Sequence, residues 1–144
     1  IFVIAGFLSF STGTAWGTFG ILIPIVVVVA QAIDPSGALI TITLSATLAG
    51  SVFGDHCSPI SDTTILSSAG AGCVHIEHVA TQLPFALIVA TSAFSGYIVA
   101  GFTGSLVLSL GTGFIIMVCV LSYLHMRNLK RETYADHEAL HPTK

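Results

Sequence analysis

The stretch FGILIPIVVVVAQAI occupies residues 19–33 and contains no charged side chain. In water such a β-branched run could form a buried strand, but a lipid bilayer admits only helices and closed barrels. The run lacks the in-and-out alternation of a barrel strand, so it predicts a transmembrane helix. Its 15 residues fall short of the roughly 20 that cross a bilayer, and the glycine-rich residues 11–18 precede it directly. The sequence therefore predicts either a broken helix or one arm of a re-entrant hairpin that begins at Ile1.

The composition of the chain is typical of a membrane protein. Hydrophobic residues make up 53% of the chain and charged residues only 8%, against about 25% charged residues in soluble domains. All four lysines and arginines follow Leu124, and we expect no nucleic-acid binding because phosphate neutralisation needs clustered cations. Cys57, Cys73 and Cys119 are odd in number and lie among apolar or small residues, which predicts reduced thiols rather than a disulfide framework.

Apolar stretches and turns alternate along the middle of the chain. Proline and glycine at residues 34–37 predict a turn at a membrane surface. The apolar pattern resumes over residues 38–53 and runs into the polar residues 54–68. Residues 69–82 are small and mixed, which predicts an interfacial connection between two membrane segments.

Two cleaner spans follow, over residues 84–101 and 105–124, and each is long enough to cross about 30 Å of hydrocarbon. A tight turn at residues 102–104 separates them. The polar tail carries every basic residue of the chain, so the positive-inside rule places it in the cytoplasm. The sequence thus predicts an all-α fold of polytopic transmembrane helices, with a transmembrane part over residues 1–124 and a cytoplasmic tail over residues 125–144.

The polar residues 54–68, GDHCSPISDTTILSS, contain two aspartates on either side of a proline. Asp55 and Asp62 are seven residues apart, so an unbroken helix would place both carboxylates on one face. Pro59 removes a backbone donor and Gly54 weakens the helix, which predicts an unwound segment with free carbonyl oxygens. Such a break occurs at membrane depth only where protein buries it or where it lines a wet cavity.

This segment has the chemistry of a sodium site. Sodium is a hard cation that prefers carboxylate, carbonyl and hydroxyl oxygens, and removal from water disfavours the charged form of a carboxyl group, so protons and sodium compete for one site. Asp62 is the first candidate for the shared carboxylate and Asp55 the second. As an alternative, both aspartates cap helix ends in a surface loop. The hydroxyl candidates are Ser58, Ser61, Thr63, Thr64, Ser67 and Ser68.

Residues 11–18, STGTAWGT, are the second candidate element of the site, because glycine-permitted turns there present hydroxyl and carbonyl oxygens between apolar segments. The GxxxG spacing of Gly13 and Gly17, repeated by Gly50 and Gly54, equally indicates close helix packing. The candidate ligands of this element are Ser11, Thr12, Thr14 and Thr18.

Three further signals are weaker. His56-Cys57 and Cys73-x-His75-x-x-His78 contain residue types that zinc favours, but neither group has the spacing of a metal site. We interpret these histidines as satisfied or interfacial. Trp16 is either an interfacial anchor or a packing residue within the site, and its place inside a polar motif favours packing.

The motifs FSTGTAWGTFGILIPI, GDHCSPISDTTILSSAGAG and HVATQLPFA resemble the NhaC family of sodium/proton antiporters, over residues 7–86. The resemblance implies a prokaryotic inner-membrane protein that uses the proton gradient to expel sodium, and some relatives exchange malate and lactate. It also implies inverted repeats, with a re-entrant hairpin tip at residues 11–18 and an unwound helix at residues 54–68. Carried over by motif, the ion-path candidates are Asp55, His56, Ser58, Ser61, Asp62, Thr63 and Thr64, with Ser11, Thr12, Thr14 and Thr18 opposite.

Sodium/proton antiport is therefore the leading hypothesis, and we expect no enzymatic activity and no cofactor. A malate/lactate-type antiporter is the close alternative. Residues 1–124 contain no lysine or arginine that could bind an organic anion, so such a substrate would have to be held by the N-terminal ends of half-helices. An intramembrane aspartyl protease is a remote alternative, because such enzymes place their two carboxylates on separate helices.

The chain begins inside an apolar stretch without a methionine or a charged leader, so we expect it to be the carboxyl-terminal part of a longer transporter. The expected partners are Na⁺, H⁺, the lipid bilayer and the amino-terminal part of the same protein. A second copy of the chain is a further candidate partner, in a homo-oligomer.

Overall fold

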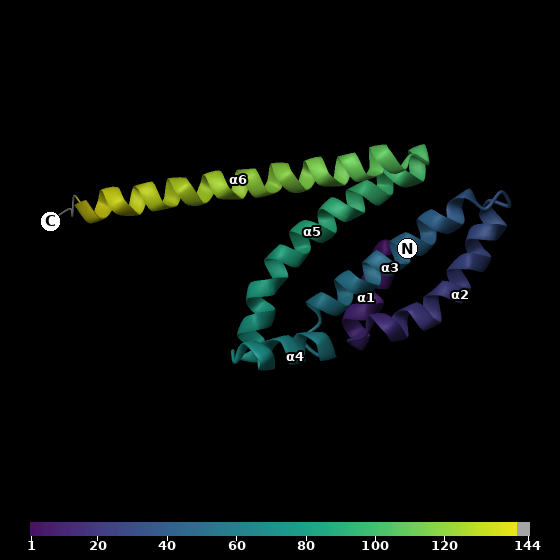
Figure 1. Cartoon of the computed structure of the whole chain (residues 1–144), viewed down its shortest axis with the longest axis horizontal. Helices are drawn as coiled ribbons and strands as arrows, with labels where there is room; N and C mark the ends of the chain where they lie inside the picture. The colour runs from purple at the N-terminus through teal and green to yellow at the C-terminus, as the bar shows by residue number, and fades with distance from the viewer. Residues whose placement is uncertain (141–144) are drawn as a thin grey trace.

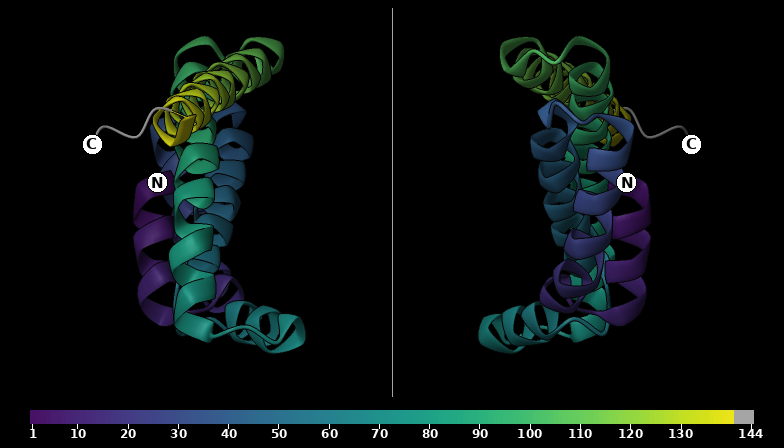
Figure 2. Two further views of the ribbon diagram at one scale, coloured as in Figure 1. Left: turned by 90° about the vertical axis from the view of Figure 1, so that its left-hand side faces the viewer. Right: turned by 90° about the vertical axis from the view of Figure 1, so that its right-hand side faces the viewer.

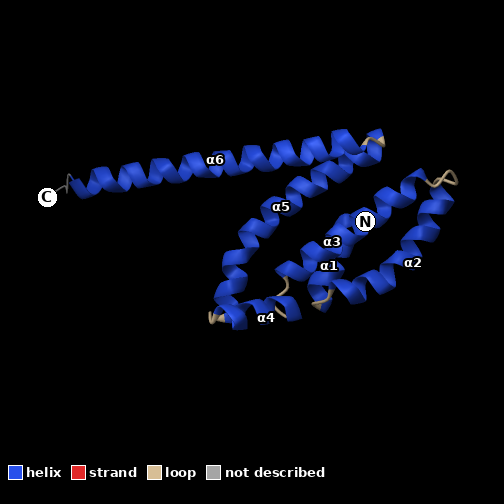
Figure 3. Ribbon diagram, viewed as in Figure 1, coloured by secondary structure: helices blue, strands red, loops and turns tan. Residues whose placement is uncertain are grey.

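The computed structural model describes the backbone of residues 1–140 and the side chains of residues 1–128. Helices joined by short connections make up this part, and no strand occurs in it (Figures 1 and 3). The all-α prediction is confirmed. The helices are α1 (Phe2–Thr12), α2 (Ala15–Ile33), α3 (Ala38–Cys57), α4 (Asp62–Ala71), α5 (His75–Thr103) and α6 (Leu106–Leu140).

Four segments are long and apolar enough to cross a membrane, namely α2, α3, α5 and the part Leu106–Asn128 of α6. Many of their large apolar side chains are exposed on the chain. Exposed apolar surface on this scale is unfavourable in water and suits a helix surrounded by lipid. The chain is therefore part of a multi-pass membrane protein, as its sequence predicts.

Two helices are longer than expected. The apolar run belongs to the 19-residue α2, which begins at Ala15 and is long enough to span. The expected interfacial connection over residues 69–82 is wrong, because α4 ends at Ala71 and α5 already begins at His75. Pro84 lies inside α5 and does not end it, since a proline can bend a helix whose other turns remain bonded. The turn between α5 and α6 lies at residues 104–105, close to its expected place.

The helices α1 and α3 run parallel with their backbones in contact. A Cβ atom on Gly50 would collide with the carbonyl oxygen of Phe2, and one on Gly54 with the carbonyl oxygen of Gly6. A methyl group at either position therefore has no room. The packing interpretation of the Gly50 and Gly54 spacing is confirmed, because only hydrogen at these positions lets two helix backbones approach so closely.

Helix α5 lies antiparallel against α3. The hydroxyl of Tyr97 donates a hydrogen bond to the carbonyl of Ser45 (3.0 Å), and the amide of Gln82 donates to the carbonyl of His56 (2.9 Å). Helix α6 packs on α5, where the hydroxyl of Ser109 donates to the carbonyl of Gly96 (2.8 Å). Figure 1 shows α6 then diverging from the group formed by α1, α2 and α3.

The turn between α2 and α3 falls at residues 34–37, as predicted. The carboxylate of Asp34 accepts hydrogen bonds from the backbone N–H groups of Ser36 (3.0 Å) and Leu39 (3.3 Å), and Gly37 has the left-handed φ of 82°. The bonds from Ser36 lower the pKa of Asp34 below its usual range. This end of the bundle therefore carries a stable negative charge, on the side opposite α4 (Figure 1).

We predict that Gly54→Ala lowers the thermal stability of the full-length transporter in detergent, although alanine favours a helix by about 1 kcal/mol over glycine. The added methyl meets the backbone of α1, and overpacking of this kind costs about 1–3 kcal/mol. Gly101→Ala is the matched control, because nothing lies within 4 Å of a Cβ atom there. Equal melting temperatures for the two variants would contradict the packing described above.

Candidate ion-binding site

The break that Pro59 predicts is present, but it is shorter than expected. Only residues 58–61 are non-helical, since α3 continues through Cys57 and α4 begins at Asp62. The backbone N–H of Ser58 donates to the carbonyl of Asp55 (3.1 Å), and that of Ser61 donates to the carbonyl of Ser58 (3.3 Å). Gly54 and Asp55 stay helical because the glycine contact with α1 holds the last turns of α3 in place.

Asp55 is a buried carboxylate at the inner edge of this break, with 6% of its surface exposed. Its Oδ2 accepts a hydrogen bond from Thr63 Oγ1 (3.4 Å), which lies 2.8 Å from Ser61 Oγ. Its Oδ1 is buried and has no hydrogen-bond partner among the described side chains. A buried polar atom without a partner is unfavourable in a protein, so the position of this oxygen calls for an explanation.

Asp62 has a different environment from Asp55. It is the first residue of α4, it is exposed on the chain, and its Oδ1 accepts from the backbone N–H of Thr63 (2.8 Å). A carboxylate in this position is stabilised by the dipole at the helix N-terminus. Asp62 thus marks the start of α4, as the capping alternative expects, although Ser61 holds the N-cap position. That alternative does not fit Asp55, which is buried within α3.

Hydroxyl groups surround the break on its protein-facing side. The residues Ser58, Ser61, Thr64 and Ser68 are buried, whereas Thr63, Ser67 and His56 are exposed on the chain. The ring Nδ1 of His56 lies 3.1 Å from the carbonyl of Val52, one helical turn earlier. Figure 2 shows that α4 then projects sideways from the end of the bundle. The break and the start of α4 therefore form a compact group of oxygen atoms.

The first polar motif meets the break in space. Gly13 ends α1 with the left-handed φ of 69°, and a Cβ atom there would lie 2.9 Å from the carbonyl oxygen of Ile60. Thr14 caps α2 by accepting from the N–H of Gly17 (3.3 Å). The turn between α1 and α2 is thus a helical hairpin whose tip touches residues 58–61, although some 45 residues of sequence separate the two.

The hydroxyls of this tip differ in burial. Thr18 is buried and donates to the carbonyl of Thr14 (2.9 Å), and its Oγ1 lies 3.4 Å from that of Thr12. Ser11 and Thr12 are exposed on the chain. Trp16 is 83% exposed and packs edge-on against Phe19. The expectation that Trp16 packs within the site is wrong, because the first turn of α2 directs it outward.

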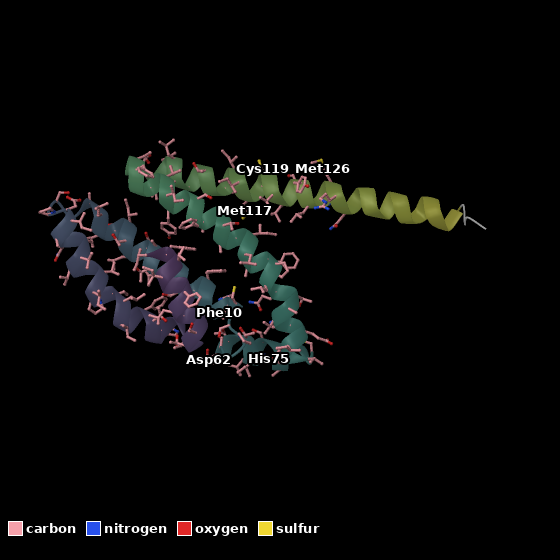
Figure 4. All side chains as sticks on the ribbon, turned by 180° about the vertical axis from the view of Figure 1, so that it is seen from behind. Phe10, Asp62, His75, Met117, Cys119 and Met126 are labelled. Atoms are coloured by element: carbon pink, nitrogen blue, oxygen red, sulfur yellow. The ribbon has the colours of Figure 1, made fainter. Side chains whose placement is uncertain are left out.

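His75 connects the break to α5, and sequence reasoning missed this contact. Its Nε2 lies 2.7 Å from the carbonyl oxygen of Pro59, and its Nδ1 lies 3.1 Å from Ser68 Oγ. Because a carbonyl only accepts, Nε2 carries a proton. Both ring nitrogens are bonded, so the interpretation of His75 as a satisfied histidine is confirmed. Figure 4 shows His75 and Asp62 at the same end of the molecule, around α4.

A second residue missed from the sequence is Ser9. It lies on the buried face of α1 with 0% exposure, and its Oγ has no hydrogen-bond partner among the described side chains. The signal in the sequence was weak, since one serine in an apolar run is common. Among residues 1–128 no three histidine, cysteine or acidic side chains gather as a metal site, and Cys57, Cys73 and Cys119 are free thiols.

Comparisons with known proteins agree with a transport function. A Haemophilus influenzae protein described as uncharacterized is 58% identical over 105 residues, which cover 73% of this chain and 20% of that protein. A Haemophilus influenzae protein described as an uncharacterized Na⁺/H⁺ antiporter is 39% identical over 92 residues, covering 61% of this chain and 19% of its own length. The malate-2H⁺/Na⁺-lactate antiporter of Bacillus subtilis is 32% identical over 81 residues, which cover 56% of this chain and 17% of that protein.

The chain spans about a fifth of the length of these relatives. No solved structure matches it. The family profile described as "Na⁺/H⁺ antiporter family" matches residues 1–102, which include the hairpin tip, the break, Asp55 and His75. The resemblance seen in the sequence motifs is thereby confirmed, and the chain belongs to the Na⁺/H⁺ antiporter family.

Proposed function

We propose that the protein containing this chain exchanges sodium ions for protons, and that Asp55 is the carboxylate that the two ions occupy in turn. The observation that carries this proposal is the burial of Asp55 at a helix break with its Oδ1 unpartnered among the described residues. Membership of the Na⁺/H⁺ antiporter family supports the same activity.

Charge balance explains why mobile cations would be needed. Residues 1–124 contain four acidic residues and no lysine or arginine, so this region has no permanently charged basic side chain to neutralise Asp55. An isolated buried carboxylate is strongly unfavourable, and it becomes stable when a proton or a metal cation neutralises it. If one site binds either a sodium ion or a proton, but not both together, and opens alternately to the two sides of the membrane, the movements of the two ions are coupled.

Burial favours Asp55 over Asp62 as the shared carboxylate, which reverses the order expected from the sequence. Asp62 is exposed on the chain and already stabilised by the N-terminus of α4. In the proposed mechanism Asp62 attracts cations to the break, and Asp55 binds them. The hydroxyls of Thr63 and Ser61 lie beside Asp55, because Thr63 Oγ1 donates to Asp55 Oδ2 and lies 2.8 Å from Ser61 Oγ.

The proposed orientation places the break on the cytoplasmic side. The basic residues follow the apolar part of α6, and the positive-inside rule puts that end in the cytoplasm. Helix α5 therefore begins near the cytoplasm at His75, and the antiparallel α3 ends there at Cys57. Asp55 would accept ions from the cytoplasm in this arrangement, and the rest of the transporter would supply the opposite access.

Exchange of organic acids is the second candidate, and one relative carries that activity in its printed name. A dicarboxylate needs positive charge at the site, but residues 1–124 contain no lysine or arginine. The oxygen atoms around the break favour a cation instead. The sequence similarity supports malate and lactate exchange, whereas the chemistry of the site supports sodium.

We predict that Asp55→Asn abolishes sodium-driven proton movement by the full-length transporter in vesicles, because the amide cannot exchange one cation for another. Asp62→Asn is the matched control and should keep most of the exchange rate, since it only weakens attraction at the entrance. Collapse of an acid gradient on sodium addition measures both. Normal exchange by Asp55→Asn would remove this residue from the mechanism.

We further predict that sodium alone collapses the acid gradient in vesicles that contain no organic anion. Malate added as its choline salt should give no response, because the described site offers oxygen ligands rather than cations. A response that requires both malate and sodium would instead assign the protein to organic-acid exchange.

A further inference from the structure

Three buried oxygen atoms have no hydrogen-bond partner among the side chains of residues 1–128. They are Ser9 Oγ on α1, Asp55 Oδ1 on α3 and Thr64 Oγ1 on α4. Other buried hydroxyls are satisfied within their own helices, such as those of Thr47 and Ser51, which donate to carbonyls four residues earlier. Buried polar atoms without partners are uncommon in proteins, and each one calls for an explanation.

Packing brings the three atoms to the same end of the bundle. Gly6 of α1 lies against Gly54 of α3. Beyond the ends of both helices, Gly13 lies against Ile60. Ser9 lies between these two contacts on the buried face of α1, so it lies beside the segment that contains Asp55.

Helix α4 adds the third atom. The hydrogen bond from Thr63 Oγ1 to Asp55 Oδ2 (3.4 Å) holds the first turn of α4 against the carboxylate. Thr64 follows in the same turn and faces inward, with 3% of its surface exposed. Three helices that meet near the break therefore each carry one buried oxygen without a partner among the described residues.

Groups from the rest of the transporter do not reach these atoms in the described conformation. Each of the three oxygens is sealed by residues of this chain, so an outside residue would have to displace α1, α3 or α4. A small ion or a proton needs much less space. One carboxylate oxygen and two hydroxyl oxygens form a ligand set suited to a hard cation.

We propose that Ser9 and Thr64 are ligands of the sodium ion that neutralises Asp55, an inference that rests on the function proposed above. When sodium is bound, all three oxygens direct lone pairs at the ion. When a proton replaces it, the carboxyl group of Asp55 donates a hydrogen bond to one of the two hydroxyls. The hydroxyls therefore affect sodium binding more than proton binding, because the proton is bonded covalently to the carboxylate.

The test compares Ser9→Ala with the wild type in full-length transporter reconstituted into vesicles. Loss of one ligand should raise the sodium concentration for half-maximal exchange about tenfold, which corresponds to about 1.4 kcal/mol. The maximal rate should stay the same, and the preference for sodium over lithium should change. Ser92→Ala is the matched control. Ser92 is buried as Ser9 is, but it lies on α5 and its hydroxyl donates to the carbonyl of Ile88 (2.9 Å). It should leave these values unchanged.

A second measurement separates a ligand from an unused hydroxyl. If Ser9 Oγ were only an unpaired buried group, its removal would be neutral or stabilising, and sodium would raise the melting temperature of Ser9→Ala as much as that of the wild type. If Ser9 binds the ion, this sodium-dependent rise becomes smaller in Ser9→Ala and in Thr64→Val. Choline chloride is the ionic-strength control.

The Asp55→Asn variant distinguishes failure of this inference from failure of the proposed function. If Asp55→Asn loses exchange while Ser9→Ala and Thr64→Val keep normal sodium dependence and normal sodium stabilisation, the ligand assignment is overturned and the function stands. If Asp55→Asn exchanges normally, or the wild type shows no sodium response, both proposals fall.

Discussion

The contact between the backbones of α1 and α3 is the constraint on which the candidate site depends. Gly50 and Gly54 lie against the carbonyls of Phe2 and Gly6, where no larger residue fits. This contact holds the last turns of α3 in helical form, so Asp55 is buried rather than released into the break. It also sets the position of the hairpin tip, where Gly13 touches Ile60 beyond the end of α3. These two glycines therefore set how closely α1 approaches the end of α3 that carries Asp55.

Polar groups near the break divide into those with partners and those without. His75 bonds to Pro59 and Ser68, and thereby satisfies the carbonyl of Pro59, which lies in the non-helical break. Such bonding makes a break tolerable at membrane depth, because freed backbone groups need partners there. Asp55 Oδ1 receives no comparable bond from the described residues. The break is thus stabilised without this oxygen, which is the basis for the proposal that Asp55 binds an ion.

Much of the fold could be predicted from the sequence because lipid restricts the choices. An apolar run such as residues 19–33 must be helical once barrels are set aside, and Pro59 interrupts a helix wherever it stands inside one. The ends of helices were harder to predict. Residues 75–82 look interfacial because they carry His75, Glu77 and His78, yet they continue α5, since nothing in them breaks a helix and packing on α3 supports its first turns.

The sequence by itself determined that this chain crosses a membrane, that its middle holds two aspartates around a proline, and that no lysine or arginine accompanies them. Only the tertiary structure separated Asp55 from Asp62, because burial depends on what packs against each one. It also placed His75 against the break, since contacts between residues far apart in sequence arise from helix packing and leave no pattern along the chain. Residue type decides which chemistry is available, whereas packing decides which of those residues are removed from water.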